Sequence, residues 1–373
     1  MRILQTANVV APEASAVATT LRALAHGYRS AGHVVTRVVP GTEHRREMTA
    51  DAEVITVRAR RVPGTGYRMI TDNRRMLRML DDVRPDRIEV SDRFTAQAVG
   101  RWAQRHGVPT VVLPHERLDA VLATYVRSPR LARFMADFWN LRLVVSFDTV
   151  VCATDWAREE FTRLGVENLV RIRPGVDLAT FHPDHASAAL RRRLVPDGAA
   201  LLVTANRLVA EKQPQLAIDT VRALRGRGVP AHLVMAGDGP LREACRRRAA
   251  DLPVRFLGHV ADRGRLARLL ATADVVLAPG AAETFGLAAL EALASGTPVV
   301  GHQGGALPEL LDVAAGAVTA GDPDAFATAA LRLMATDEGS RRAAARAHAE
   351  RFGWPGTVAQ MLAVHQAAVP RAA

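Results

Sequence analysis

Two cationic side chains in the C-terminal half have the types and spacing to hold a diphosphate. Arg207 and Lys212 lie five positions apart, directly after an expected strand over 199–205. Arginine offers a planar fork of donors and lysine a compact charge, so that the pair could straddle two phosphates. Lys212 is the sole lysine among 49 cationic residues. The spacing alone is equally compatible with a simple ion pair from Lys212 to Glu211 or Asp219.

Two carboxylates flank the start of an expected helix over 284–295, which follows an expected strand over 274–278. Backbone N–H groups and the positive end of a helix dipole attract anions at such a junction. Glu283 and Glu291 could accept hydrogen bonds from sugar and ribose hydroxyls there. The alternative is that Glu283 caps the helix and Glu291 is solvated.

One histidine in the N-terminal half follows the expected strand over 110–113. His115 could orient a sugar hydroxyl. The structural alternative, in which Glu116 pairs with His115, is favoured by spacing alone.

Several catalytic patterns are absent. The sequence has no GxGxxG, P-loop, GxSxG or HExxH pattern, which disfavours dehydrogenase and NTPase functions. The Asp322-Pro323-Asp324 segment matches the DxD pattern of metal-dependent transferases. It precedes a helical run, however, which favours a turn and an N-cap. Cys152 and Cys245 are far apart and favour neither a disulfide nor a zinc site. We expect no metal.

Composition indicates a globular cytoplasmic protein. A length of 373 residues favours two domains, and no apolar run matches a membrane span or a signal peptide. The formal charge of +11 comes from arginines spread along the chain, so we expect no nucleic-acid partner.

Expected strands and helices alternate in both halves, which predicts α/β architecture with two doubly wound parallel sheets facing a cleft. A Pro/Gly-marked crossing over 173–190 separates an N-terminal domain (1–172) from a C-terminal domain (191–351). The family resemblance described below implies that the last segment, 352–373, returns to the N-terminal domain. The expected strands cover 2–5, 32–39, 87–90, 110–113, 149–153, 199–205, 232–236, 254–257, 274–278 and 298–301, and the expected helices cover 19–31, 73–83, 96–106, 213–225, 240–250, 284–295 and 307–311.

Motifs along almost the whole chain resemble the retaining GT-B glycosyltransferases of family GT4. They are Gly32-His33-Val34-Val35, Arg173 to Asp177 with Phe181-His182-Pro183, Arg207 with Lys212, Ala236 to Pro240, the Glu283-to-Glu291 pattern, Ser295 to Val300 and Phe352-Gly353-Trp354. Within that family the chain is most similar to actinobacterial GDP-mannose-dependent α-mannosyltransferases of the phosphatidylinositol-mannoside type. This likeness rests on residues 64–68, 89–93, 114–119 and 148–152.

The resemblance implies transfer of a hexose, most simply mannose from GDP-mannose, to a hydroxyl acceptor with α configuration and no cofactor. It implies catalytic roles for His115, Arg207, Lys212 and Glu283. Donor binding would involve Arg207, Lys212, Gly237, Val260, Glu283, Thr284, Phe285, Gly286, Leu287 and Glu291, and the acceptor side Ser15, Ala16, Tyr67, Asp92, His115 and Glu116.

The sequence departs from the family in the loop after the first strand. Ser15 and Ala16 stand where a Gly-Gly pair is usual, and each Cβ narrows the approach of a ligand. This departure leaves open a nucleotide-sugar-binding protein that is impaired in transfer. A second alternative is the same fold with a UDP-sugar donor, because spacing does not distinguish guanine from uracil. A lipid-linked acceptor and the basic surface favour peripheral contact with an anionic membrane at its inner face. The oligomeric state is not determined.

Overall fold

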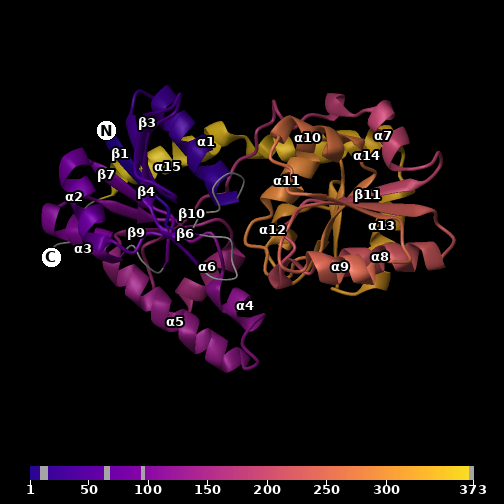
Figure 1. Cartoon of the computed structure of the whole chain (residues 1–373), viewed down its shortest axis with the longest axis horizontal. Helices are drawn as coiled ribbons and strands as arrows, with labels where there is room; N and C mark the ends of the chain where they lie inside the picture. Colours follow the sequence, from indigo (N-terminus) through magenta and orange to yellow (C-terminus); the bar gives the residue numbers. More distant parts are fainter. Residues whose placement is uncertain (9–15, 63–67, 94–96, 369–373) are drawn as a thin grey trace. The chain divides into compact units, whose positions relative to one another are not determined.

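The chain forms two compact units in a computed structural model (Figure 1). Unit 1 comprises Met1–Pro174 and Trp354–Ala373, and unit 2 comprises Gly175–Gly353. The structure describes residues 1–8, 16–62, 68–93 and 97–368. Ser15 and Tyr67, both expected on the acceptor side, lie outside these ranges.

Unit 1 is built on an eight-stranded sheet with the order β10-β9-β8-β7-β1-β2-β4-β3, in which only the β3–β4 pairing is antiparallel. The inner strands are rich in buried apolar residues, as in a sheet that is covered on both faces, whereas the edge strand β3 is polar and mostly exposed. The strands of the unit are β1 (Arg2–Thr6), β2 (Val34–Gly41), β3 (Arg45–Met48), β4 (Glu53–Arg58), β7 (Arg87–Val90), β8 (Thr110–Val112), β9 (Thr149–Cys152) and β10 (Leu169–Arg171), with a separate short pair β5 (Arg60–Arg61) and β6 (Arg68–Met69).

Helices follow most strands of unit 1. They are α1 (Ala16–Ser30), α2 (Asn73–Val83), α3 (Gln97–His106), α4 (Leu118–Ala123), α5 (Pro129–Ser146), α6 (Asp155–Thr162) and α15 (Trp354–Ala367). The expected return of the C-terminal helix is confirmed, because α15 belongs to unit 1 and packs on α1.

A buried polar cluster attaches α15 to the sheet of unit 1. Glu89 on β7 accepts hydrogen bonds from Gln5 Nε2 (3.1 Å) and Tyr28 Oη (2.8 Å), and His365 Nε2 of α15 lies 3.3 Å from the same carboxylate. All four side chains are fully buried. Burial and the neighbouring Glu89 carboxylate raise the pKa of Tyr28.

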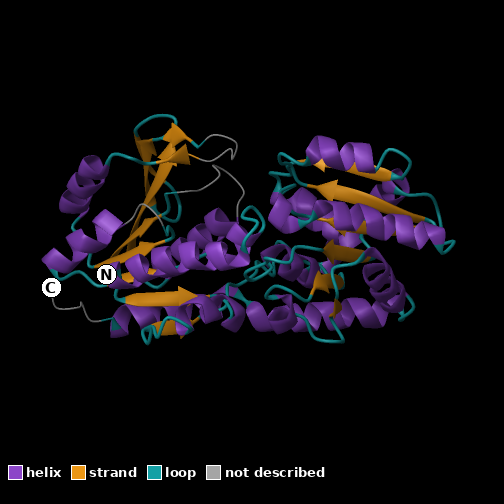
Figure 2. Ribbon diagram, turned by 90° about the horizontal axis from the view of Figure 1, so that it is seen from below, coloured by secondary structure: helices purple, strands orange, loops and turns teal. Residues whose placement is uncertain are grey.

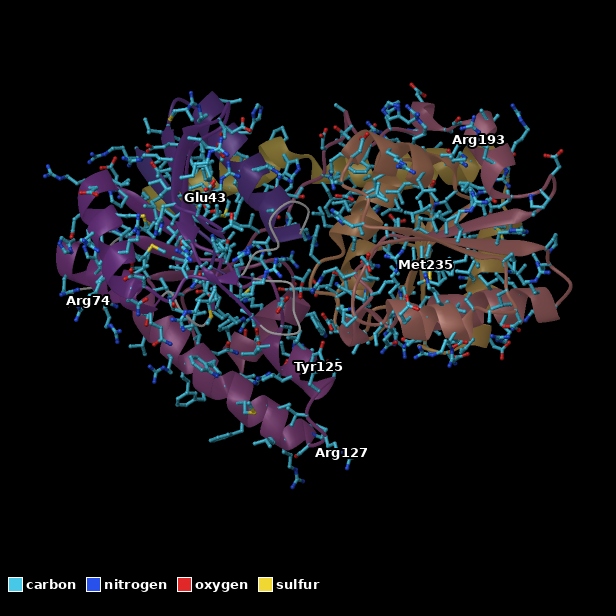
Figure 3. All side chains as sticks on the ribbon, in the orientation of Figure 1. Glu43, Arg74, Tyr125, Arg127, Arg193 and Met235 are labelled. Carbon is cyan, nitrogen blue, oxygen red and sulfur yellow. The ribbon has the colours of Figure 1, made fainter. Side chains whose placement is uncertain are left out.

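Unit 2 has a six-stranded, fully parallel sheet with the order β13-β12-β11-β14-β15-β16, covered by helices on both faces (Figure 2). Met235 of β12 lies in its interior (Figure 3). The strands are β11 (Ala200–Thr204), β12 (Ala231–Ala236), β13 (Val254–Gly258), β14 (Val275–Ala278), β15 (Val299–His302) and β16 (Gly316–Thr319). The helices are α7 (Ala188–Leu194), α8 (Pro214–Gly226), α9 (Arg242–Arg248), α10 (Arg263–Thr272), α11 (Leu287–Ala294), α12 (Leu307–Leu310), α13 (Pro323–Met334) and α14 (Glu338–Ala349), with 3-10 turns η1 (Pro183–His185), η2 (Ala210–Lys212) and η3 (Glu350–Phe352).

Several sequence expectations differ from the fold in extent. The helix expected over 284–295 begins three residues later, because Gly286 has a φ of 90° and ends the loop before α11. Segments for which no element was expected also form helices, among them 118–146, where α4 and α5 lie. No helix in the described part of the chain is long and apolar enough to cross a membrane. The expected N-cap at Asp322 is confirmed, since its carboxylate accepts a hydrogen bond from the N–H of Ala325 at 2.8 Å.

Candidate active site

The strand order of unit 2 creates a switch point between β11 and β14. From β11 the chain proceeds outward to β12 and β13, whereas β14, β15 and β16 continue on the other side. The loops that leave β11 and β14 therefore diverge at the carboxyl edge of the sheet, and ligands of open α/β sheets bind at such points. The loop after β11 carries Arg207 and Lys212, and the loop after β14 carries Glu283.

Lys212 and Glu283 meet across this switch point. Lys212 Nζ donates a hydrogen bond to Glu283 Oε2 at 2.6 Å, and both side chains are less than one-fifth exposed. Gly280 makes room for the contact, since a Cβ there would lie 3.3 Å from Lys212 Cα. The alternatives drawn from spacing, in which Lys212 pairs with Glu211 or Asp219, are wrong.

The neighbouring acidic groups are engaged elsewhere. Glu211 Oε1 lies 3.3 Å from a guanidinium nitrogen of Arg207, and Asp219 forms a pair of 2.7 Å hydrogen bonds with Arg248. Arg207 is more exposed than Lys212, with 39% of its side-chain surface accessible. Because Arg207 keeps this exposure after the end of β11, its guanidinium group can still contact an anionic ligand.

The backbone around Glu283 is fixed by close packing. The Glu283 carbonyl accepts a hydrogen bond from the N–H of Ala306 at 2.8 Å, and a Cβ at Gly305 would lie 3.0 Å from the N of Glu283. The loop that carries the Glu283 carboxylate is therefore held in place by its packing. The alternative that Glu283 caps α11 is wrong, since Gly286 is the N-cap residue of that helix.

The segment from Thr284 to Leu287 is buried and leads into α11. Gly286 has a φ of 90°, and a Cβ at that position would also lie 2.5 Å from a methyl group of Leu307. Glycine is therefore required for this turn. The turn presents backbone N–H groups of the first helical residues near the carboxyl end of β14, as an anion site needs.

Glu291 lies one turn inside α11 and is 4% exposed, so the alternative that it is solvated is wrong. Arg263, the first residue of α10, donates a hydrogen bond to Glu291 Oε1 at 2.8 Å. The Arg263 guanidinium also lies 4.6 Å from the ring centre of Phe181. Burial raises the pKa of Glu291, and the charge of Arg263 opposes that shift.

Gly237 and Val260 follow the two strands beyond β11. A Cβ at Gly237 would lie 1.9 Å from the carbonyl oxygen of Asn206, so glycine allows the Arg207 loop to lie against the end of β12. Val260 is half-buried and follows β13.

The carboxyl edge of the unit 1 sheet carries His115. It follows β8, and its Nε2 forms a 2.9 Å hydrogen bond with Ser91 Oγ, which follows β7. Pairing with Glu116 is wrong, because the Glu116 side chain is exposed and its backbone carbonyl accepts from Arg93 instead. Burial lowers the pKa of His115 to about 4, with Glu89 opposing and Arg93 adding to the shift.

A buried ion pair holds the loop that follows His115. Arg93 pairs with Glu160 and also donates to the backbone carbonyl of Glu116, and the other oxygen of Glu160 accepts from the N–H of Leu118 at 3.0 Å.

Two further residues expected on the acceptor side differ in exposure. Asp92 is buried beside Arg93, and Ala16 is exposed at the start of α1.

Arg263 and Ser91 are the polar partners that sequence reasoning did not single out. Arg263 follows the helix-capping Asp262, so that its linear context indicates only a helix start. Ser91 lies within the segment 89–93, which carries part of the family resemblance, but no spacing connects it to His115. Within the described ranges, no group of three or more His, Cys, Asp or Glu residues could hold a metal ion.

Solved structures align with this chain over nearly its whole length. Sucrose-phosphate synthase from Thermosynechococcus elongatus aligns with a TM-score of 0.81 at 20% identity, covering 98% of both chains. Anabaena HepE, solved in complex with UDP and glucose, aligns with a TM-score of 0.76 at 17% identity and covers 98% of this chain and 99% of its own. At these identities the likeness establishes the fold, which is GT-B.

Family models and a full-length relative define the family. The model described as "Glycosyl transferase 4-like domain" matches residues 15–175, and the model "Glycosyl transferases group 1" matches 199–336. The chain is 44% identical over 365 residues to a GDP-mannose-dependent alpha-(1-6)-phosphatidylinositol dimannoside mannosyltransferase of Mycobacterium tuberculosis, covering 97% of this chain and 95% of the relative. A D-inositol 3-phosphate glycosyltransferase of Xylanimonas cellulosilytica is 37% identical over 250 residues, covering 62% of this chain and 59% of the relative. The protein is a glycosyltransferase with two α/β units. It belongs to the GT4 family.

Proposed function

We propose that this glycosyltransferase moves a mannosyl group from GDP-mannose to a hydroxyl of a lipid-linked inositol mannoside. The relative from Mycobacterium tuberculosis, which shares 44% identity over 97% of this chain, supports both the donor and the acceptor class. The observation that carries the proposal is the Lys212–Glu283 pair at the β11–β14 switch point.

The donor diphosphate and the sugar compete for the two members of this pair. A diphosphate is a stronger partner for an ammonium group than one carboxylate, since it offers more charge and more acceptor oxygens. When Lys212 and Arg207 hold the diphosphate, Glu283 becomes available to accept hydrogen bonds from sugar hydroxyls. Donor binding then exchanges one internal ion pair for two ligand contacts.

Glu291 has a separate role in this proposal. It is nine-tenths buried, and one of its oxygens accepts from Arg263. The other can accept from a ribose hydroxyl, because a carboxylate offers acceptor positions on both oxygens. The backbone of Phe285 to Leu287 supports sugar and phosphate through its N–H groups.

His115 acts in transfer as a neutral imidazole. With a pKa of about 4 it is uncharged at neutral pH, so it can donate or accept one hydrogen bond to a sugar hydroxyl without adding a charge. The proton of the acceptor hydroxyl passes to the leaving diphosphate, whose oxygens are the nearest strong base in this proposal. The residues of the chain then provide orientation and charge stabilisation, and no resident metal is required.

Two measurements test the function. Thermal-shift titration should show stabilisation by GDP and a much smaller shift with UDP, because a ligand that binds the native state raises the melting temperature. Incubation with GDP-mannose and an inositol-mannoside lipid should yield a product with one added hexose. Stabilisation by UDP alone, or GDP binding with no transfer to any inositol mannoside, contradicts the proposal.

A further inference from the structure

Helix α11 of unit 2 carries one ionisable side chain among apolar ones. Every residue of the helix other than Glu291 is leucine or alanine. Glu291 is 4% exposed. Replacing a buried ion pair by well-packed apolar residues is often neutral or stabilising, so such a pair is a poor source of stability. The packing of α11 therefore does not account for a carboxylate at this position.

The partner of this carboxylate is Arg263, the first residue of α10. Its guanidinium donates a hydrogen bond to Glu291 Oε1 at 2.8 Å, and α10 packs beside α11 in unit 2 (Figure 1). A cation in the first turn of a helix opposes the dipole of that helix. The charge of Arg263 therefore does not stabilise α10, and it acts on Glu291 instead.

The Arg263 guanidinium is held from more than one side. It lies 4.6 Å from the ring centre of Phe181, which is fully buried. Burial raises the pKa of Asp177, but hydrogen bonds within its own turn and the charge of Arg263 lower it overall. A planar cation between an aromatic ring and two carboxylates has little freedom to turn.

The segment that carries Phe181 is itself fixed on α11. Arg346 of α14 donates hydrogen bonds to the carbonyl of Phe181 at 2.8 Å and to the carbonyl of Ala294 at 2.9 Å. The N–H of Phe181 also donates to the carbonyl of Asp177 at 2.9 Å. Because Ala294 ends α11, the Phe181 ring and the guanidinium that stacks on it keep their positions relative to that helix.

The pairing leaves the second oxygen of Glu291 open. Arg263 contacts Oε1, and no donor in the described part of the chain forms a hydrogen bond with Oε2. The Arg263 side chain is one-third exposed, so the pair lies near the surface of unit 2. Burial raises the pKa of Glu291, whereas the charge and the hydrogen bond of Arg263 lower it. Arg263 thus favours the ionised carboxylate, in which Oε2 can only accept.

We propose that Arg263 is a positioning residue that makes the donor site selective for ribonucleotides over deoxyribonucleotides. It holds Glu291 through Oε1, so that Oε2 accepts from the ribose hydroxyls. A sugar without these hydroxyls would leave Oε2 covered and unpaired, which disfavours its binding. The inference rests on the proposed function in one respect, the contact between Glu291 and the ribose.

Calorimetry with two nucleotides tests this role. GDP and 2′,3′-dideoxy-GDP share the base and the diphosphate and differ only in the ribose hydroxyls. Wild type should bind GDP about 10–100-fold more tightly, the factor expected for hydrogen bonds to a charged group. In Arg263→Met this ratio should fall to about threefold or less, and the affinity for the dideoxy nucleotide should stay within about twofold of wild type. General damage to the site would weaken both nucleotides.

Glu291→Gln tests the carboxylate through which Arg263 acts. The ratio of the two affinities should fall in this variant as it does in Arg263→Met. The double variant with both changes should lower the ratio no further, because the arginine acts only through the carboxylate. A double variant with a ratio well below that of either single variant would contradict the proposal.

Arg191 provides a matched control in the same unit. Its side chain is 35% exposed, and it donates a hydrogen bond at 2.9 Å to the buried carboxylate of Asp274. Asp274 directly precedes β14, so this pair lies at the amino end of the strand, away from the candidate site. Arg191→Met should lower the melting temperature and leave the ratio of the two nucleotide affinities at its wild-type value.

Arg263→Lys covers the case in which the methionine variant fails to fold. It keeps the charge but loses the planar fork, so the ratio should fall by at least about threefold. The proposal is overturned if wild type binds both nucleotides equally or if an Arg263 variant keeps the wild-type ratio. It is also overturned if an Arg263 variant loses affinity for both nucleotides to the same extent.

These measurements separate the role of Arg263 from the proposed function. The samples contain no mannosyl donor and no acceptor, so the result does not depend on transfer. If UDP binds in place of GDP, the same comparison applies to UDP and 2′,3′-dideoxy-UDP. Normal discrimination without transfer contradicts the proposed function alone, whereas transfer without discrimination contradicts the role of Arg263 alone.

Discussion

Lys212 Nζ and Glu283 Oε2 lie 2.6 Å apart, although 71 positions separate the two residues in the chain. Each is at the carboxyl end of a different strand, and these strands, β11 and β14, are neighbours in the sheet. An ion pair at this point holds two groups that the proposed donor would separate. The ion pair therefore connects stability to ligand binding.

Removal of either donor cation should reduce transfer far more than stability. For Lys212→Ala and Arg207→Ala we expect kcat/KM to fall by about 10²–10³-fold, as when one charge-stabilising donor is lost. The free energy of unfolding should fall by about 1–2 kcal/mol or less. Arg222→Ala, which removes an exposed ion pair with Asp251, is the control and should leave both unchanged. Normal turnover in the Lys212 variant would show that the residue has no role in transfer.

Exchange of the two charges should separate the ion pair from the ligand site. Lys212→Glu and Glu283→Lys each place like charges together, which we expect to lower the free energy of unfolding by about 1–3 kcal/mol. The double exchange should recover most of that loss, because opposite charges again meet. Transfer should not recover, since the ammonium group then extends from the other loop. A double variant as active as wild type contradicts the proposed division of roles.

His115 should make the stability of unit 1 depend on acid pH. Its pKa is lowered from 6.5 to about 4 in the folded state, so the unfolded chain binds the extra proton first as the pH falls. The contribution of His115 to the free energy of unfolding is therefore fully present above pH 6.5. It is lost as the pH falls toward 4, by on the order of 3 kcal/mol. His115→Gln should lose less stability over this interval. Denaturant unfolding of both proteins at pH 7 and pH 5 measures the difference, and parallel losses would argue against it.

Gly237→Ala should displace the Arg207 loop. The added Cβ would lie 1.9 Å from the carbonyl oxygen of Asn206, so either the loop or the end of β12 must move. We expect the affinity for GDP to fall about tenfold or more, measured by calorimetry, because misplacement of a binding group by about 1 Å is costly. Gly226→Ala at the end of α8 is the matched control, since its Cβ would meet no atom within 4 Å. Equal affinities in the two variants would exclude this role for Gly237.

Tyr28→Phe should destabilise unit 1 without altering nucleotide binding. The variant removes the hydroxyl that donates to Glu89 at 2.8 Å in a fully buried cluster with His365. Loss of a donor to a buried carboxylate costs about 1–3 kcal/mol. The free energy of unfolding should fall by this amount, whereas Tyr125→Phe at an exposed site should leave it unchanged. A stable Tyr28 variant would mean that the cluster contributes little to the attachment of α15.

Much of the fold was accessible from local sequence patterns. The alternation of apolar strands with amphipathic helices predicted two parallel sheets, whereas the returning helix after Trp354 was implied by the family resemblance. The spacing of apolar residues within a segment indicates which side of that segment is buried, and this spacing can be read from the segment alone. The exposure of Phe134 and Phe138 on α5 could not be predicted in this way, because the sequence does not distinguish an exposed phenylalanine from a buried one.

The sequence by itself determined which residues stand at strand ends, since a strand is followed by its loop wherever the strand lies in the sheet. It thereby identified Arg207, Lys212, Glu283 and His115 as candidates. The tertiary structure alone decided their partners. Lys212 had acidic residues nearby in sequence, yet it pairs with Glu283, because the order of strands brings β14 beside β11. The order of strands in the sheet depends on the packing of all the helices, which no single segment encodes.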